Sequence, residues 1–208
     1  MSDIFKTVIV IAGAYLIGNV NFALIISKLL KSDVRTKGSG NPGTLNMTRS
    51  FGVKIGVLTL VLDALKGALP TLAGMLFMQA RLGAHLAAFF VVVGHVFPVF
   101  LKFKGGKGIA SSIGVCLVLQ PLCAAALLLT AVLFIYLTSM GSIASFLVIS
   151  FPLALEGFAA ASDLAYNALF SALLIFGLFA LTVIAHRKNI LKLFCGTESK
   201  TVIKKRKA

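Results

Sequence analysis

The chain has 208 residues, of which 59% are hydrophobic and only 12% are charged, and its mean hydropathy is +1.01. A soluble domain could not cover its surface with so few charged side chains, so this composition excludes the ordinary soluble classes and predicts an integral membrane protein. Apolar runs fill most of the length and leave no stretch long enough for a separate soluble domain. We therefore expect a single multi-pass membrane domain over residues 1–208.

The formal charge of +14 comes from 20 lysines and arginines against 6 aspartates and glutamates, and the basic residues gather at 28–54, 102–107 and 187–207. Such clusters lie on the cytoplasmic side of membrane helices, where anionic lipid attracts them. We therefore expect the three clusters to face the cytoplasm and to contact anionic membrane lipid. Nucleic acid is not an expected partner, and the sequence indicates no obligate protein partner.

Seven apolar runs separated by short polar gaps predict an all-α membrane protein with about seven transmembrane helices. The predicted spans are 4–30, 53–78, 82–99, 109–119, 121–137, 141–155 and 164–185. Several are shorter than the roughly 20 residues that a full helical crossing requires, so we expect local thinning of the bilayer or a partly re-entrant pair. A model with five crossings, in which residues 109–155 are partly re-entrant, is the alternative.

The gaps between the later spans set the expected topology. If the basic tail is cytoplasmic, residues 156–163, which include Glu156 and no basic residue, lie outside, and residues 138–140 lie inside. Residues 109–137 must then cross the membrane to the outside and return to the cytoplasmic side. Pro121 marks the turn, because proline has no amide hydrogen and its ring clashes with the preceding helical turn. This topology places the N-terminus outside and the C-terminus in the cytoplasm.

The first polar loop, residues 37–49, is rich in glycine and small polar side chains. Its glycines match the dinucleotide-binding spacing, but that pattern has meaning only between a strand and a helix of a soluble unit, so no nucleotide is expected. Glycines uncover the backbone amides, Ser39 and Asn41 add neutral donors, and the guanidinium of Arg49 can hold phosphate through two parallel hydrogen bonds. The loop predicts phosphate binding, with a tight turn into the next helix as the alternative.

A second glycine-rich stretch, residues 104–108, lies between two apolar runs. Its three glycines uncover backbone amides between the ammonium groups of Lys104 and Lys107, so the stretch can hold a phosphate at the membrane edge. It is not a P-loop, because Leu101 stands where the first glycine belongs and Gly108 where Ser or Thr belongs. The next helix should direct its positive dipole end toward Lys107. A cytoplasmic turn with topogenic lysines is the alternative.

The third polar segment begins at His186. On a helix, His186 and Asn189 share a face, where an imidazole and an amide could reach the same ligand. A helix end that merely carries polar residues is the alternative. The cationic neighbours Arg187 and Lys188 are expected to lower the pKa of His186.

Three polar sites lie within or beside the predicted spans. Asp63 and Lys66 are three residues apart on one helical face, and an ion pair that faces the bundle interior is favoured over a catalytic role. Ser142 and Ser145 follow an expected cytoplasmic turn; we expect them to pack or to bond the backbone, with substrate contact as the alternative. His85 is expected to be buried or at the outer edge, and the sequence shows no partner for it.

Together these segments resemble the acyl-phosphate:glycerol-3-phosphate acyltransferase family of the PlsY type over nearly the whole chain. The matching residues are Gly38, Ser39, Gly40, Asn41, Pro42, Gly43, Asn46 and Arg49, then the stretches 63–67, 94–98 and 104–108, and then His186, Asn189, Leu193, Gly196, Thr197 and Glu198. The chain departs from the family pattern at Thr44 and Leu45, where Ala and Thr are expected. It also departs at Lys192, where Arg is expected, and this change removes a possible bidentate contact.

The resemblance implies a bacterial inner-membrane enzyme, with its active site facing the cytoplasm, that catalyses the first acylation step of phospholipid synthesis. Such an enzyme transfers a fatty acyl group from acyl phosphate to the 1-hydroxyl of glycerol 3-phosphate and releases lysophosphatidate and inorganic phosphate. The family implies no acyl thioester donor, no metal and no other cofactor. Because acyl phosphate is an activated mixed anhydride, we expect direct attack by the hydroxyl without an acyl-enzyme.

The resemblance and the residue chemistry together assign the expected roles. Donor-side residues for acyl phosphate are Ser39, Gly40, Asn41, Gly43 and Thr44. Acceptor-side residues for glycerol 3-phosphate are Arg49, Lys107, His186 and Asn189, which with Ser39 form the expected catalytic set. Further substrate contacts are expected from Asn46, Lys104, Gly105, Gly106, Gly108, Ser142 and Ser145, and structural roles from Asp63, Lys66 and Glu198. Either His186 or a substrate phosphate takes the hydroxyl proton, and the phosphate is favoured.

A transporter of small phosphate esters is the alternative function, because it would also place basic residues and broken helices around an anion site. Transporters of that kind carry an internal repeat and bind near the middle of the membrane. This chain has no detectable repeat, and its phosphate-binding residues all fall at one expected face. The enzyme is therefore favoured.

Overall fold

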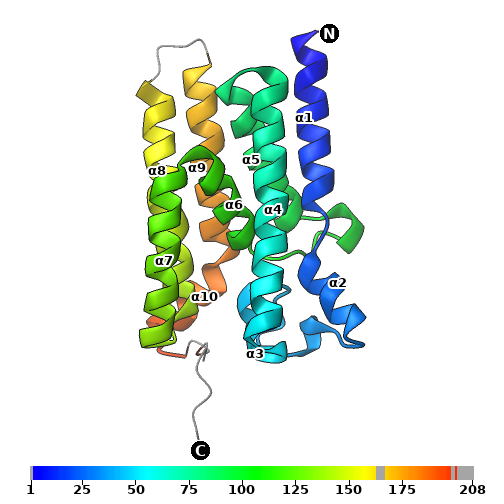
Figure 1. Ribbon diagram of the computed structural model, residues 1–208, viewed down its shortest axis with the longest axis vertical. Coiled ribbons are helices and arrows are strands. Elements are labelled where there is room, and N and C mark those ends of the chain that lie inside the picture. Colours follow the sequence, from blue (N-terminus) through cyan, green and yellow to red (C-terminus); the bar gives the residue numbers. More distant parts are fainter. Residues whose placement is uncertain (1, 163–166, 198–199, 201–208) are drawn as a thin grey trace, which may run out of the picture.

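The computed structural model describes residues 2–162, 167–197 and 200, and most of these residues are helical (Figure 1). The α-helices are α1 (Asp3–Gly18), α2 (Phe22–Leu29), α3 (Thr44–Phe51), α4 (Val53–Met78), α5 (Arg81–Val96), α6 (Ile109–Leu119), α7 (Pro121–Thr138), α8 (Gly141–Ser162), α9 (Ala168–Ala185) and α10 (Arg187–Phe194). Two short 3-10 helices, η1 (Val34–Thr36) and η2 (Val99–Leu101), lie in the loops. The predicted all-α class is confirmed.

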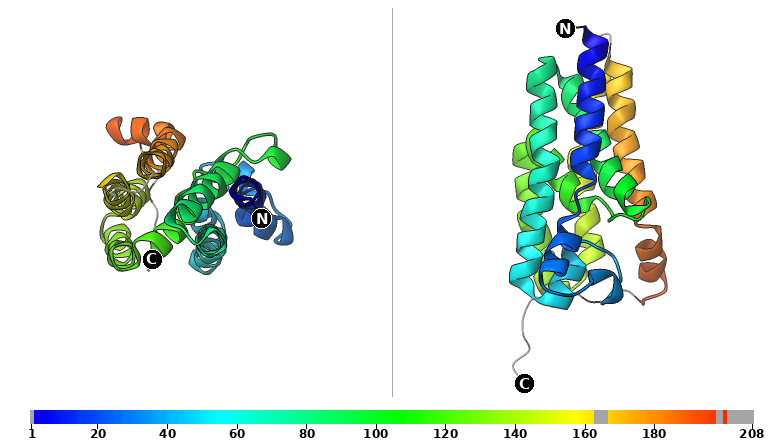
Figure 2. Two further views of the ribbon diagram at one scale, coloured as in Figure 1. Left: turned by 90° about the horizontal axis from the view of Figure 1, so that it is seen from above. Right: turned by 90° about the vertical axis from the view of Figure 1, so that its right-hand side faces the viewer.

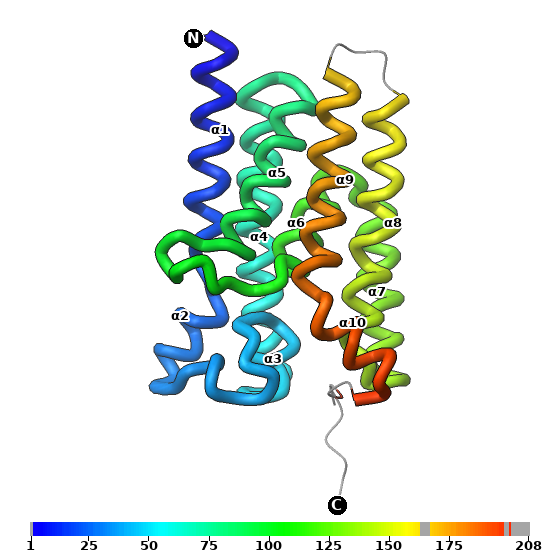
Figure 3. Tube along the Cα trace, turned by 180° about the vertical axis from the view of Figure 1, so that it is seen from behind, coloured from blue at the N-terminus to red at the C-terminus, as the bar shows by residue number. Residues whose placement is uncertain are grey.

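Among the described residues, six helical segments are long and apolar enough to cross a membrane, and α6 is a shorter apolar helix. Six of the seven predicted spans each correspond to one helix, the first span contains two, and the expectation that some spans are short is confirmed. As predicted from Pro121, α6 and α7 are separated at Gln120. Their turn lies part-way along the bundle rather than at its end (Figures 1 and 3).

The first predicted span, 4–30, is broken at Asn19–Asn21. The Asn19 amide donates to the carbonyl of Tyr15 (2.7 Å), and Asn21 accepts from a backbone amide in the first turn of α2 (3.0 Å). Asparagine side chains compete with the helical backbone in this way, so a continuous apolar run gives two helices. Asn21 also donates to the carbonyl of Pro42 (3.3 Å), which ties the first polar loop to the break.

Helices α4 and α6 cross closely because glycine lies at the contact. A Cβ atom at Gly67 would lie 2.0 Å from the carbonyl oxygen of Ser111, and one at Gly114 would lie 1.9 Å from that of Ala64. Small residues let membrane helices approach until their backbones touch. The crossing holds the first turns of α6 against the part of α4 that carries Asp63.

The predicted end of the 141–155 span is wrong, because α8 continues to Ser162, so residues 156–162 are helical rather than a loop. The side of the membrane on which they lie stays a prediction. Glu156 is buried: its Oε1 atom lies 2.8 Å from Nε2 of His85, and its Oε2 atom accepts from Arg81 (3.0 Å) and Gln120 (2.7 Å). His85, for which the sequence showed no partner, is thus paired with a carboxylate from another helix. A carboxylate inside a membrane needs such partners, and this one joins α5, α8 and the α6–α7 turn.

The described ends of the chain lie at opposite ends of the bundle, since α1 begins at one end and α10 lies at the other (Figure 1). Helices α2, α3 and α10 and their loops gather at one end, which we call the polar end and define as residues 30–52 and 186–197 (Figures 1 and 2). The predicted topology requires termini at opposite ends. Which end faces the cytoplasm stays a prediction.

Candidate active site

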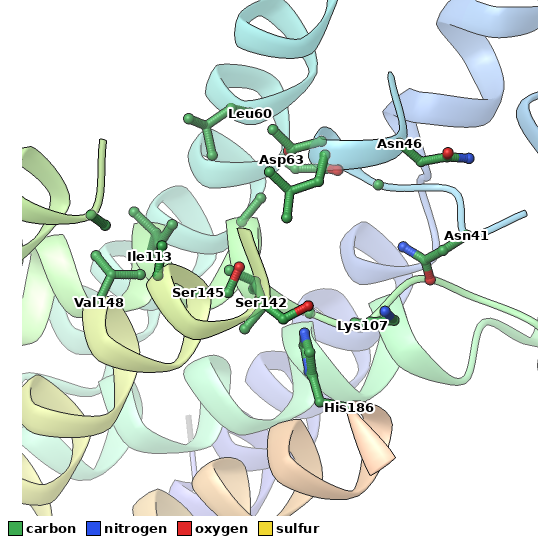
Figure 4. A pocket seen from close by; sticks show the side chains of 18 of the residues that line it. Asn41, Asn46, Leu60, Asp63, Lys107, Ile113, Ser142, Ser145, Val148 and His186 are labelled. Atoms are coloured by element: carbon green, nitrogen blue, oxygen red, sulfur yellow. The ribbon is translucent and has the colours of Figure 1, made fainter. Parts of the chain in front are cut away.

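A cavity of about 150 Å³ lies near the polar end, between α3, α4, α6, α7, α8 and the start of α10. Its polar wall is formed by Ser39, Asn41, Gly43, Thr44, Asn46, Arg49, Asp63, His95, Lys107, Gly108, Ser142, Ser145, His186 and Asn189. Its apolar wall is formed by Leu45, Leu60, Ile109, Ala110, Ile113, Leu128, Ala131, Val132, Ile135, Ala144 and Val148. Lys107, Ser142 and His186 converge on one side, whereas Ile113 and Val148 lie on the other (Figure 4).

The side chain of Asn46 gives the first polar loop its shape. Its amide donates to the carbonyls of Val34 (3.1 Å) and Lys37 (2.9 Å), and its oxygen accepts from the backbone amide of Ser39 (3.0 Å). A Cβ atom at Gly38 would lie 2.2 Å from that oxygen, and Gly38 has a positive φ of 54°, so glycine is required there. Asn46 therefore positions the residues of the loop that line the cavity.

Two helix N-termini open on the cavity. Helix α3 begins after Gly43 and helix α6 begins after Gly108, and neither has a side chain that caps its first turn. The hydroxyl of Thr44, in the first turn of α3, is buried without a hydrogen-bond partner in the described part of the chain. Uncapped N–H groups and the positive end of the helix dipole attract anions, so the cavity offers two positions for phosphate.

Asn189 of α10 connects the 104–108 loop to α8. Lys107 donates to the side-chain oxygen of Asn189, and the amide of Asn189 donates to the hydroxyl of Ser142 (2.6 Å). Residues from the 104–108 loop, α8 and α10 are thereby joined in one chain of hydrogen bonds. Because an amide is uncharged, it orients the ammonium group of Lys107 without neutralising it.

His186 is buried at the end of α9 and is neutral near pH 7. Its Nδ1 atom lies 2.9 Å from the carbonyl oxygen of Thr182, which can only accept, so Nδ1 carries the hydrogen and Nε2 carries a lone pair. Burial lowers the pKa of His186 to about 4, and nearby Lys107 adds to that shift, whereas the Thr182 carbonyl opposes it. The predicted direction is confirmed, but the causes are burial and Lys107 rather than Arg187 and Lys188.

Two basic side chains and one ion pair lie at the cavity. Arg49 lines it, and its Nε atom donates to the carbonyl of Lys200 (3.2 Å). Asp63 also lines it, but the ammonium of Lys66 lies 2.9 Å from the Asp63 carboxylate, and both side chains are almost fully buried. The predicted ion pair is confirmed. The Asp63–Lys66 pair is neutral overall, and Arg49 and Lys107 are cationic side chains of the lining with which a phosphate can form hydrogen bonds.

Comparison with known proteins identifies the family. Residues 8–196 match the family model described as glycerol-3-phosphate acyltransferase. The chain belongs to the glycerol-3-phosphate acyltransferase family. It is 43% identical to a glycerol-3-phosphate acyltransferase of Trichlorobacter lovleyi, over 91% of this chain and 95% of that protein. The corresponding protein of Paraburkholderia phymatum is 37% identical, over 97% and 95% of the two chains.

A solved structure supports the same assignment. The crystal structure of PlsY (YgiH), an integral membrane glycerol 3-phosphate acyltransferase in its glycerol 3-phosphate form, matches with a TM-score of 0.78 and 34% identity, over 93% of this chain and 94% of that one. The lysophosphatidic acid form matches with a TM-score of 0.75. The resemblance to the PlsY type, the acyltransferase class and the multi-pass membrane character are therefore confirmed.

The structure brings most of the expected glycerol-3-phosphate acyltransferase residues to the cavity but not all of them. The expected residues that line it are Ser39, Asn41, Gly43, Thr44, Asn46, Arg49, Asp63, Lys107, Gly108, Ser142, Ser145, His186 and Asn189. Those that do not line it are Gly40, Lys66, Lys104, Gly105 and Gly106. Glu198, for which a structural role was expected, lies outside the described residues.

The expected phosphate cradle at 104–108 needs correction. The amide of Gly105 donates to the carbonyl of Val96 (3.2 Å) and that of Gly106 to the carbonyl of His95 (3.1 Å), so these amides already have partners. Lys104 is exposed. The amide of Gly40, in the first loop, is likewise taken by the carbonyl of Lys37 (2.9 Å). Of the 104–108 stretch, only its last two residues line the cavity.

Two features of this acyltransferase site were not predicted. Residues 37–49 were expected to form a polar loop, but helix α3 begins at Thr44; the apolar side chains of Met47 and Phe51, four residues apart, indicate this short helix. No role was assigned to His95, which lines the cavity and is almost fully buried. Nothing in the sequence pairs His95 with α4, because that contact depends on how α4 and α5 pack.

Proposed function

We propose that this acyltransferase moves a fatty acyl group from acyl phosphate to the 1-hydroxyl of glycerol 3-phosphate, giving lysophosphatidate and inorganic phosphate. One observation carries the proposal: a single cavity joins a polar half, which contains Arg49, Lys107 and two uncapped helix N-termini, to an apolar half. Two phosphate groups and one acyl chain are the chemical features of this substrate pair. The glycerol 3-phosphate and lysophosphatidic acid forms of the related PlsY structure agree with that acceptor and product.

The donor phosphate is placed at the start of α3. Ser39, Asn41, Gly43 and Thr44 line this part of the cavity, and the Thr44 hydroxyl, which has no hydrogen-bond partner among the described residues, can donate to an anion there. Neutral donors and backbone amides stabilise the charge that develops on a leaving phosphate without neutralising it beforehand. We therefore assign this part of the cavity to the phosphate group of acyl phosphate, which is the leaving group of the reaction.

The acceptor phosphate is placed beside the basic side chains of Arg49 and Lys107. Lys107 and Asn189 form one side of this site, His186 lies beside them, and Arg49 adds a guanidinium that can bind phosphate through two hydrogen bonds. Ser142, which is bonded to Asn189, supplies a further hydroxyl. Glycerol 3-phosphate held here would present its 1-hydroxyl toward the donor.

The acyl chain is placed in the apolar half. Leu60 of α4 and Leu128 and Val132 of α7 line this half. Helix α7 packs against α6 and α8, and its apolar span is among the least buried in the bundle. Burial of each methylene contributes about 0.8 kcal/mol, so a long acyl chain would bind here strongly. An opening between α4 and α7 would let the chain extend into the membrane.

Catalysis would consist mainly of positioning. The 1-hydroxyl oxygen attacks the acyl carbonyl carbon, the bond from that carbon to the phosphate oxygen breaks, and inorganic phosphate leaves with the electron pair. Holding both reactants in one cavity can supply on the order of 7–11 kcal/mol of the barrier in favourable cases. No acyl-enzyme is needed, because the donor is already activated.

A substrate phosphate oxygen is the proposed acceptor of the hydroxyl proton. A phosphate monoester has a second pKa of about 6. The pKa of His186 is lowered to about 4, so its imidazole is the weaker base of the two. The lone pair on Nε2 of His186 can still accept a hydrogen bond from the hydroxyl and hold it in place. His186 then orients the acceptor while the phosphate takes the proton.

The proposed location is the bacterial inner membrane, with the polar end in the cytoplasm. The basic clusters of residues 28–54 and 187–207 support this orientation through the positive-inside rule. Glycerol 3-phosphate is a polar metabolite that a cytoplasmic opening would admit. The whole chain would act as one membrane domain, without a metal or other cofactor.

Turnover in detergent tests the proposal against transport. Purified protein in micelles, which enclose no compartment, should form lysophosphatidate and inorganic phosphate in equal amounts from palmitoyl phosphate and glycerol 3-phosphate. Replacement of palmitoyl phosphate by palmitoyl-CoA should abolish turnover. Flux of glycerol 3-phosphate into reconstituted vesicles without any product in micelles would reject the enzyme and support a transporter.

A further inference from the structure

A buried lysine lies directly behind the cavity wall. The Lys66 side chain is 3% exposed, and its ammonium group contacts the Asp63 carboxylate (2.9 Å), Nδ1 of His95 (2.7 Å) and the carbonyl oxygen of Val20. The contact with Asp63 is an ion pair, whereas the Val20 carbonyl and Nδ1 of His95 accept hydrogen bonds from the ammonium group. The contacts come from α4 itself, from α5 and from the break between α1 and α2, so Lys66 joins three segments.

The contact between Lys66 and His95 fixes the orientation of the imidazole. Because Lys66 donates to Nδ1, that atom carries the lone pair, and the ring is held with its Nε2 edge against the 104–108 loop. A Cβ atom at Gly106 would lie only 2.2 Å from Nε2, and one at Gly105 would lie 2.0 Å from the carbonyl oxygen of His95. The two glycines are required because the loop folds tightly over this histidine.

The backbone of the loop is bonded to the same residue. The amide of Gly106 donates to the carbonyl of His95, and the amide of Gly105 donates to that of Val96. Gly106 precedes Lys107, whose ammonium group lines the cavity and bonds Asn189. A chain of contacts therefore runs from Asp63 through Lys66 and His95 to the residue before Lys107.

We propose that Asp63, Lys66 and His95 are positioning residues that hold the 104–108 loop so that Lys107 meets the phosphate of glycerol 3-phosphate. The inference rests on the proposed function, because it requires Lys107 to bind the acceptor. A glycine-rich loop has many accessible conformations, and ordering it costs conformational entropy at every substrate binding event. A histidine that is clamped by a buried lysine keeps the loop ordered before the substrate arrives.

The proposal predicts which kinetic constant changes. The donor side of the cavity is shaped by Asn46 through contacts that do not involve the 104–108 loop. Loss of the Lys66 clamp should therefore raise the KM for glycerol 3-phosphate and leave the KM for acyl phosphate nearly unchanged. A general loss of folded protein would instead lower the apparent kcat and change neither KM.

The first experiment replaces Lys66 by methionine. Wild-type protein is assayed first, since absence of turnover there rejects the proposed function and not this inference. Lys66→Met should raise the KM for glycerol 3-phosphate about tenfold or more, with less than about a threefold change in the KM for palmitoyl phosphate. Thr71→Val is the matched control on α4: it removes a buried hydroxyl that bonds Gly67 and should change neither KM. Equal KM values for glycerol 3-phosphate in Lys66→Met and wild type overturn the inference.

The second experiment is a double-mutant cycle that does not depend on Lys66→Met being folded. Gly106→Ala alone should raise the KM for glycerol 3-phosphate, because its methyl group meets the imidazole. In a His95→Ala background the same change should add less than about a twofold effect, since the atom it collides with is gone. Equal effects of Gly106→Ala in both backgrounds, or a loss confined to kcat in His95→Ala, overturn the positioning role.

Discussion

Lys107 donates a hydrogen bond to the side-chain oxygen of Asn189, which lies 82 positions later in the chain. One side chain from the loop before α6 and one from α10 thereby form a single wall of the cavity. Asn189 in turn bonds Ser142 of α8 (2.6 Å). This wall of the cavity, where we propose that glycerol 3-phosphate binds, thus depends on three segments that are far apart in sequence.

Asn189→Asp should therefore reduce kcat/KM for glycerol 3-phosphate about a hundredfold. A carboxylate at this position would neutralise Lys107 and repel the substrate phosphate, and a change of about 2.7 kcal/mol corresponds to that factor. Lys188→Gln is the matched control, because it makes the same change in net charge at an exposed neighbour. Similar losses in both variants would show that overall charge, and not contact with Lys107, is responsible.

His186→Gln should retain most of the turnover rate and should keep the pH dependence of the wild type. The pKa of His186 is about 4 in the free protein, so the imidazole is already neutral at pH 5.5 and loses no proton as the pH rises to 8. A fall of kcat/KM below pH 6 would then report protonation of the substrate phosphate, whose second pKa is about 6. Measurement of kcat/KM from pH 5 to pH 8 in both proteins checks this. Loss of the inflection in His186→Gln would assign it to His186.

Ala131→Phe should shift the acyl preference toward shorter chains. Ala131 faces the cavity from α7 and is almost fully buried, so a phenyl ring there would fill part of the apolar half. Leu129→Phe introduces the same ring on the exposed side of α7, where Leu129 is 74% exposed, and should leave the preference unchanged. Turnover of acyl phosphates with 8 to 18 carbons, about the range of common fatty acids, compares the two variants. An unchanged profile in Ala131→Phe would place the acyl chain elsewhere.

Glu156→Ala should destabilise the protein strongly, whereas Arg81→Ala should have little effect. Removal of Glu156 leaves His85 and Gln120 without their partner in a buried setting, and breaking a buried pair of this kind costs about 3–5 kcal/mol. The Arg81 side chain is 55% exposed, so its pairing contributes at most about 1 kcal/mol. Thermal unfolding in detergent measures both. Equal shifts in Tm would contradict the difference in burial.

Much of the helical architecture was predictable because its causes are local. Long apolar runs determine which segments enter the membrane, and Pro121 determines where α6 and α7 separate. The break at Asn21 was missed because it depends partly on the carbonyl of Pro42, a contact that exists only after folding. The C-terminal end of α8 was predicted too early, because a glutamate such as Glu156 indicates a loop. Its partners on α5 and at the α6–α7 turn, which allow it to be buried, are not evident from the sequence.

The site was predictable in composition but not in detail. Residues with phosphate-binding chemistry, such as Ser39 and Lys107, do reach the cavity because the segments that carry them return to one end of the bundle. The sequence alone could not show that the amides of Gly105 and Gly106 are already bonded. For the same reason it could not distinguish a glycine that binds a ligand from one that makes room for His95.

Helix α6 connects the cavity to the buried Glu156 cluster. It has 11 residues, so it is about 16 Å long, and it runs from Gly108 at the cavity to Gln120 beside Glu156. If Lys107 binds the substrate phosphate as proposed, a bilayer whose thickness disturbs the Glu156 cluster should also shift the start of α6 next to Lys107. The affinity of this enzyme for its water-soluble substrate is therefore expected to depend on the lipid around it.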